Sequence, residues 1–190
     1  GTYSYGTLSS TDRAFGGLST STNFTTIGAE FTNAGSTGIA SVLISFYQEK
    51  WRRGSRTSGE DRMDFQYSVN ATSLSTGTWV DVDTLDVVSA WESGSSAALD
   101  GNANRVQRSG TISFASAVSP SSNFWIRWTD VFITGTNDGM AIDDFSLTAT
   151  FVSSPPPAVV PEPSTLALFL GLSTVGGPMV LLRGKKRKTI

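Results

Sequence analysis

Apolar residues recur at every second position in several stretches of residues 1–152, and this alternation constrains the fold most. The clearest stretches are 23–33, 39–50, 62–70, 123–133 and 140–151. Successive side chains of a β-strand point to opposite faces, so alternation of this kind is typical of strands with one face in a core. Clusters of Gly, Ser, Thr and Asn separate the stretches, and none has the apolar spacing of an amphipathic helix. We therefore predict an all-β fold, an antiparallel β-sandwich.

The strongest predicted strand is 39–50. Val42, Ile44 and Phe46 share one face, and Leu43 and Tyr47 share the other, so we expect a central strand covered on both sides. Elsewhere we expect an edge strand and loop over 1–22, a polar connection over 51–61, a short strand at 79–82, a strand or helical turn at 85–88, an exposed loop over 93–104 and a strand over 105–115.

The composition of the predicted domain, residues 1–152, excludes several kinds of site and argues against one class of partner. This part has nine basic residues against fifteen acidic ones. A net negative body argues against nucleic acid as a partner, because phosphate binding needs a basic face. The sequence contains no Cys and no His, which excludes disulfides, thiolate metal sites, His-ligated zinc and Ser-His-Asp triads.

The composition changes after residue 152. Residues 153–160 include three consecutive prolines, which predict a stiff, extended linker. Residues 166–182 form an uncharged apolar run of 17 residues, or roughly 26 Å as a helix, near the lower limit for a bilayer core. A basic tail, 183–188, follows: Arg183, Lys185, Lys186, Arg187 and Lys188. Because retained positive charge marks the cytoplasmic side, we predict one C-terminal transmembrane helix with the C-terminus in the cytoplasm.

Pro161, Glu162 and Pro163 precede this run. Together with the apolar run and the basic end, they resemble the PEP-CTERM sorting signal of Gram-negative bacteria that make exopolysaccharide. The resemblance covers 161–188 and implies that the inner membrane holds an exported precursor until an exosortase, a membrane-embedded cysteine transpeptidase, cleaves near the tripeptide. An ordinary tail anchor is the alternative. Since export is implied and no secretory signal precedes the body, we expect Gly1 to begin a processed or trimmed chain.

A second resemblance concerns the strands near the end of the body. The run 138–147, Asp-Gly-Met-Ala-Ile-Asp-Asp-Phe-Ser-Leu, resembles the closing strand of jelly-roll domains of the MAM and carbohydrate-binding-module type. The run 124–130, Phe-Trp-Ile-Arg-Trp-Thr-Asp, is similar to their penultimate strand. The resemblance implies a jelly-roll-like sandwich, often with a structural calcium and often binding glycans.

Four acids near these runs are candidate calcium ligands: Asp130, Asp138, Asp143 and Asp144. They lie at the ends of two strands that we expect to be neighbours, and calcium takes six to eight oxygen ligands. Asp143 and Asp144 are adjacent in a strand, so they face one site only across a β-bulge. In the alternative reading Asp144 caps a turn or pairs with Arg127 or Arg13, and the other acids are solvated.

Carboxylates could also serve glycoside hydrolysis, which needs two of them about 5–10 Å apart. Glu30, Glu49, Asp64 and Asp130 could furnish such a pair, but their spacing singles out none. The sequence contains no phosphate-binding loop, nucleophile elbow or metalloprotease motif. We therefore expect that the protein is not an enzyme.

Aromatic side chains in loops are the candidates for glycan binding, because sugar rings stack their C–H faces on Trp and Tyr. Trp51 and Trp91 lie at predicted loops, whereas we expect Trp79 and Trp128 in the core. Arg52, with its neighbouring arginines, would suit an anionic polysaccharide or a phosphate unless nearby acids pair with it.

These observations predict an exported bacterial protein of the cell surface or extracellular matrix whose sandwich binds extracellular polysaccharide. Its precursor would be anchored in the inner membrane and would meet an exosortase there. Two alternatives stay open, a structural surface or biofilm-matrix protein without a specific ligand and a secreted glycan hydrolase.

Overall fold

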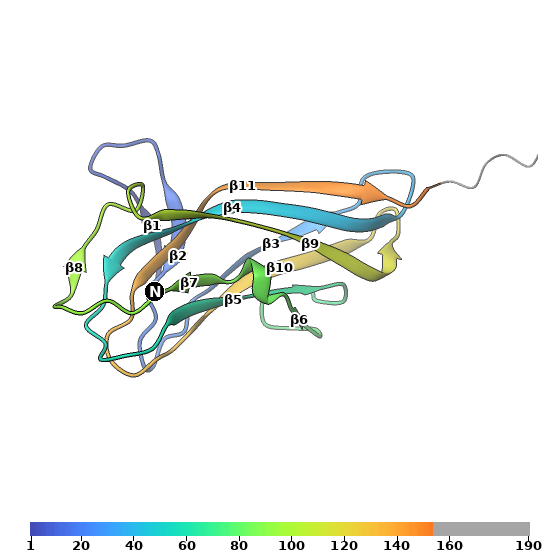
Figure 1. The fold of residues 1–190 in the computed structure, drawn as a ribbon. Helices are drawn as coiled ribbons and strands as arrows, with labels where there is room; N and C mark the ends of the chain where they lie inside the picture. Colours follow the sequence, from blue (N-terminus) through green and yellow to red (C-terminus); the bar gives the residue numbers. More distant parts are fainter. Residues whose placement is uncertain (154–190) are drawn as a thin grey trace, which may run out of the picture. The chain divides into compact units, whose positions relative to one another are not determined.

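Two antiparallel sheets pack face to face in the computed structural model, which describes residues 1–153 (Figure 1). In chain order the elements are β1 (Thr2–Tyr5), β2 (Ala14–Gly17), β3 (Thr26–Thr32), β4 (Ile39–Arg53), β5 (Asp61–Ser68), β6 (Val80–Asp81), the 3-10 turn η1 (Asp83–Leu85), β7 (Val87–Ser89), β8 (Ala97–Ala98), β9 (Arg105–Val118), β10 (Asn123–Val131) and β11 (Gly139–Phe151). Sheet A has the order β1-β2-β11-β4-β8, and β9 also pairs with β4. Sheet B has the order β3-β10-β5-β6, and β7 also pairs with β5. The predicted all-β antiparallel sandwich is confirmed.

The core fills the space between the sheets, as the alternation predicts. Val42, Ile44 and Phe46 of β4 are buried, and they face buried residues of β5 and β10. The Trp128 ring meets the Phe46 ring edge-on at 5.2 Å and the Phe65 ring at 4.9 Å. Each fully buried side chain of this size contributes about 1.5–3 kcal/mol of transfer free energy, so this cluster is the main source of stability.

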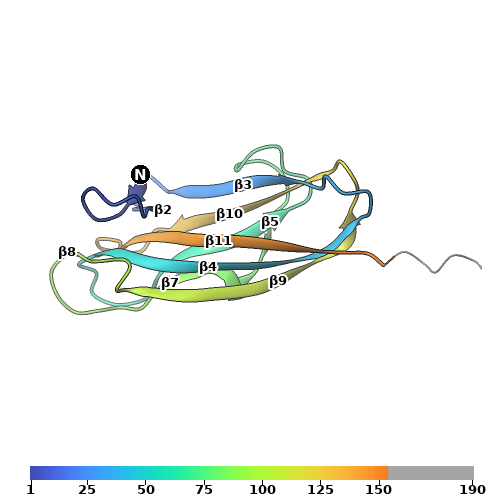
Figure 2. The same ribbon diagram turned by 90° about the horizontal axis from the view of Figure 1, so that it is seen from above.

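Strand β4 is central in sheet A, as predicted, with β11 on one side and β9 on the other (Figure 2). The β11–β4 ladder has a register shift between Asp143 and Ser146. Asp144 lies at this shift with a φ of 49°, a left-handed conformation that suits a bulge. The bulge that both adjacent acids would need in order to face one site is therefore present in β11.

The prediction of a polar connection directly after Lys50 is wrong. Strand β4 continues to Arg53, and β8, within the segment expected to be an exposed loop, pairs with its end. The Leu99 N–H donates to the Trp51 carbonyl at 2.9 Å, and Gly101 lies against the Trp51 ring. Single-strand alternation could not reveal this covering, because it comes from a segment almost fifty residues away.

The expectation that Trp79 belongs to the core is also wrong, whereas Trp128 is buried there as predicted. Trp79 is only half-buried, and the Arg127 guanidinium lies over its ring at 3.9 Å. Its indole N–H donates to the Thr76 carbonyl at 2.8 Å. A cation–π contact of this kind stabilises an aromatic ring that lies at the surface.

Residues 1–153 form one compact unit. The predicted linker from residue 154 onward, the helix 166–182, the basic tail 183–188 and the tripeptide 161–163 all lie outside the described residues. Within residues 1–153 no helix is long and apolar enough to cross a bilayer.

Candidate functional site

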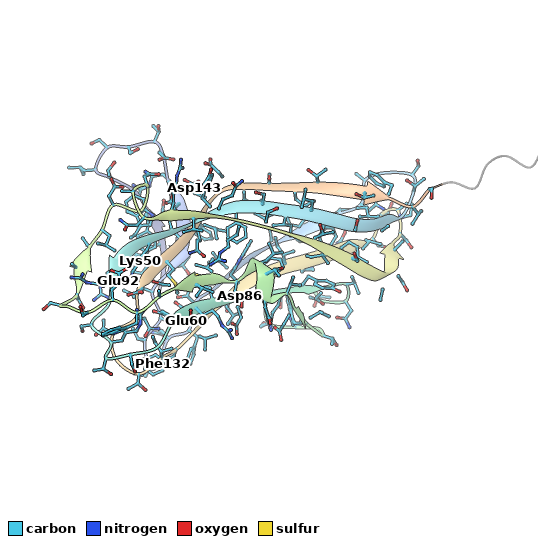
Figure 3. The ribbon with its side chains drawn as sticks, in the orientation of Figure 1. Lys50, Glu60, Asp86, Glu92, Phe132 and Asp143 are labelled. Atoms are coloured by element: carbon cyan, nitrogen blue, oxygen red, sulfur yellow. The ribbon has the colours of Figure 1, made fainter. Side chains whose placement is uncertain are left out.

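A groove opens along one side of the sandwich, where the inward-facing residues of β4 change from apolar to polar. Val42, Ile44 and Phe46 are followed in the same phase by Gln48 and Lys50. At this end a groove of about 420 Å³ lies between β4 and β9 of sheet A and β7 of sheet B. Its walls include Gln48, Lys50, Val88, Glu92, Arg105 and Arg108. We call it the β4–β7 groove, and Figure 3 labels Lys50 and Glu92 beside it.

Gln48 ties the two walls of the groove together. Its Nε2 donates to the Val88 carbonyl at 2.9 Å, and its Oε1 accepts from the Val88 N–H at 3.1 Å. The same Oε1 accepts from Nε of Arg108 at 2.8 Å. One amide thus joins sheet A to sheet B and fixes the Arg108 guanidinium by its inner nitrogen.

The buried carboxylate of Asp138 contacts two residues that line the groove, Lys50 and Ser89. Its Oδ1 accepts from the Gly54 N–H at 2.6 Å, and its Oδ2 accepts from the Ser89 hydroxyl at 2.6 Å and from Arg56 Nη1 at 2.5 Å. Burial would raise the pKa of Asp138, but hydrogen bonds from Arg56, Gly54 and Ser89 and the charge of Lys50 outweigh it and lower the pKa. Asp138 is therefore charged, and it contacts the groove through Lys50 and Ser89.

Lys50 connects Asp138 to the groove wall. Its Nζ is 3.3 Å from Asp138 Oδ2 and 3.0 Å from Glu92 Oε1. Its side chain is only 11% exposed, so the two acids largely neutralise it. Arg105 lies 4.3 Å above the Tyr47 ring and 3.8 Å from Asp144. Arg108, by contrast, forms no ion pair within residues 1–153.

Two further acids are fully buried near this end of the sandwich, Asp61 and Asp130. Burial raises the pKa of each to about 6. Asp61 Oδ2 accepts from the Asp138 N–H at 2.6 Å, and Asp130 Oδ2 accepts from the Ser19 N–H at 3.0 Å. Asp130 Oδ1 has no partner among the described residues. Because neither side chain is accessible to a ligand, these two acids affect the stability of the fold and not binding.

The four predicted calcium ligands do not come together. Protein cations and donors already occupy both oxygens of Asp138. Asp143 and Asp144 lie at the bulge of β11, where Asp143 Oδ1 accepts from the Asp144 N–H at 2.8 Å. The ion partner of Asp144 is Arg105, not Arg127 or Arg13. Residues 1–153 contain no group of three or more acids placed to hold a metal ion, so the predicted four-residue set does not fit calcium.

The two predicted aromatic binders have different surroundings. Trp51 is 8% exposed, its indole N–H donates to Glu49 Oε2 at 2.8 Å, and its ring stacks on Tyr5. Its expected exposure in a loop is therefore wrong. Trp91 is 46% exposed, and its indole N–H donates to the Arg56 carbonyl at 3.0 Å. Trp91 follows Ala90 and precedes Glu92, two groove residues, in the sequence.

Arg52 lies at a different hollow, of about 280 Å³, with residues 18–21 and with Phe132 and Asn137. Arg52 Nη1 donates to the Asn137 carbonyl at 2.7 Å. The structure thus brings none of the three predicted binders into the β4–β7 groove. Sequence reasoning missed Gln48 and Arg108, although polar residues in the inward phase of β4 were a usable signal.

Comparisons with known proteins add no assignment. No protein-family model matches the sequence, and no curated protein matches it at a significant level. What the groove can do chemically therefore follows from its own side chains. It offers fixed donors, an ion pair and apolar wall, which together suit a hydroxylated ligand.

Proposed function

We propose that the protein is an exported bacterial surface or matrix protein whose sandwich binds extracellular polysaccharide in the β4–β7 groove. The observation that carries the proposal is the composition of the groove. Val88 and Val106 supply apolar wall, and Val106 is 52% exposed. The Lys50–Glu92 pair and Arg108 supply donors and acceptors on the same walls. Apolar faces and a few fixed polar groups are what a sugar chain needs.

The size and rigidity of the groove support this function. A volume of about 420 Å³ falls in the range of ligand sites. Gln48 fixes the width of the groove through its bonds to both sheets, so little ordering is needed when a ligand binds. We further propose that the sandwich has jelly-roll topology, which the sequence of 138–147 favours.

We also propose that the chain is sorted through its C-terminal segment. The support is the sequence order of Pro161, Glu162 and Pro163, the uncharged run 166–182 and the basic tail 183–188. In this proposal the inner membrane holds the precursor with its C-terminus in the cytoplasm, and an exosortase cleaves near the tripeptide.

Binding without cleavage is the preferred proposal for the groove. Two acids are among the residues that line it, Glu92 and Glu49, although the Glu49 side chain alternates with Gln48 and Lys50 along β4 and points to the opposite face. Glu49 Oε2 accepts from the Trp51 indole, and Glu92 is paired with Lys50. Burial raises the pKa of Glu49, but the residue is only 2% exposed, and Glu92 is neutralised by Lys50. The groove therefore lacks the accessible acid and second carboxylate that hydrolysis requires. A structural matrix protein without a ligand is the other alternative, and the next experiment distinguishes it.

The test is to fill the groove with a large side chain. Ala90→Trp places an indole in the groove wall, whereas Ala98→Trp places one on exposed strand β8, away from it. The full chain, purified in mild detergent, is assayed for retention on a panel of acidic and neutral polysaccharides. We expect saturable retention of the unmodified chain and of Ala98→Trp, and loss with Ala90→Trp. Absence of retention by a chain that melts cooperatively would favour the structural alternative.

A further inference from the structure

We infer that the β4–β7 groove selects an acidic polysaccharide, one whose sugars carry carboxylates, and that Arg108 binds the carboxylate. This inference rests on the proposed function. It names the class of ligand and the residue that distinguishes it from a neutral glycan.

The geometry of Arg108 carries the inference. Gln48 Oε1 accepts the hydrogen bond from Nε, which orients the guanidinium plane. Gln48 is itself held by two bonds to the Val88 backbone. The terminal nitrogens Nη1 and Nη2 form no ion pair within residues 1–153. A guanidinium fixed in this way offers two parallel donors, which match the two oxygens of a carboxylate.

The charges around Arg108 agree with an anionic ligand. The groove contains three of the nine basic residues of the sandwich, although that part of the chain is net acidic. Its acid Glu92 is neutralised by Lys50. Glu49 alternates with Gln48 and Lys50 along β4, so its side chain points to the opposite face, where Trp51 bonds it. The charge left over in the groove is therefore positive.

A carboxylate would gain more from this site than a hydroxyl. Charge-assisted hydrogen bonds are shorter and roughly twice as strong as neutral ones. A neutral sugar would offer the Arg108 guanidinium only single hydroxyl oxygens, which are weaker acceptors than a carboxylate. Selection of this kind also weakens with ionic strength, since part of the attraction is screened by salt.

The experiment compares an acidic oligosaccharide with its neutral counterpart. Oligogalacturonate and oligomannuronate, and the same chains after carboxyl reduction, are titrated into the detergent-purified full chain by calorimetry. The variants are Arg108→Gln, Arg108→Lys and, as the matched control, Arg13→Gln. Arg13 lies between β1 and β2, at the edge of sheet A opposite β9. Arg13→Gln therefore removes one positive charge, as Arg108→Gln does, but away from the groove.

We expect the acidic chains to bind more tightly than the reduced ones, by about tenfold or more. Arg108→Gln should abolish that preference, Arg108→Lys should weaken it, and Arg13→Gln should leave it unchanged. Equal affinity for acidic and reduced chains would overturn the inference but leave glycan binding intact. Absence of binding to every chain by a folded protein would overturn the proposed function as well. Thermal melting of each variant separates loss of binding from loss of folding.

Discussion

The stability of the polar end of the sandwich depends on the carboxylate of Asp138. Its removal would leave the Arg56 guanidinium, also buried, without its counter-ion. We expect Asp138→Ala to lower the free energy of unfolding by about 3–5 kcal/mol, because an unpaired charge would stay buried. Urea denaturation measures this change. Glu60→Ala, at an exposed acid, should stay within about 0.5 kcal/mol of the unmodified protein.

Asp61 and Asp130 predict how stability changes with pH. Burial raises the pKa of both to about 6 from 3.8, so the folded state binds protons more readily than the unfolded state between these values. The free energy of unfolding should therefore rise as the pH falls from about 7.5 to about 5. At lower pH the opposite effect of Asp138 enters, because its pKa is lowered and its contribution is lost on protonation.

Melting temperatures at about pH 5 and pH 7.5 test this expectation, with higher values at the lower pH. Asp130→Asn keeps an acceptor for the Ser19 N–H and removes one titrating group. It should reduce the difference between the two pH values. A melting temperature that does not change with pH in the unmodified protein would contradict the argument.

At the scale of elements, the segment that contains β8 acts as a cover for the end of β4. A Cβ at Gly101 would lie 2.2 Å from the Trp51 ring. We therefore expect Gly101→Ala to lower the free energy of unfolding by about 1–3 kcal/mol, through overpacking. Denaturation followed by tryptophan fluorescence measures it. Ser95→Ala, at an exposed position of the same segment, is the control and should have little effect.

The sequence predicted a strand well where the buried face follows from the apolar residues of that strand alone. The buried faces of β4, β5 and β10 follow from the apolar phase at Val42, Phe65 and Trp128. The end of β4 was not predictable in this way, because distant residues bury Trp51. Alternation reports which face is apolar and contains no information about which segment will cover it.

The candidate site was less predictable than the fold. The predicted binding residues include Trp51 and Trp91, both expected in loops, and of these two only Trp91 is exposed. The groove instead depends on Gln48 and Arg108, which lie on strands β4 and β9. Their bond joins residues sixty positions apart, and only the strand register places them together.

At the scale of the whole molecule, the sorting proposal has a direct test. Replacing Pro161, Glu162 and Pro163 with alanine should leave an uncleaved, membrane-associated precursor in a bacterium that has an exosortase. Cell fractionation and gel mobility measure this. The double change Ser164→Ala and Thr165→Ala is the neighbouring control and should be processed normally. Release of the alanine-substituted chain at its usual size would rule out recognition of the tripeptide.

The pairing of β11 with β4 also has a mechanical consequence. Met140 pairs with Lys50 at the groove, and Phe151 pairs with Ile39 at the other end of the ladder. A polymer pulling on the groove, against a tether attached beyond Phe151, would load both strands along their length. Ladder hydrogen bonds run perpendicular to antiparallel strands, so they would be sheared together rather than peeled apart in turn. If the groove binds a polysaccharide as proposed, this pairing would place the ladder in shear between the bound polymer and the point where the chain leaves the sheet.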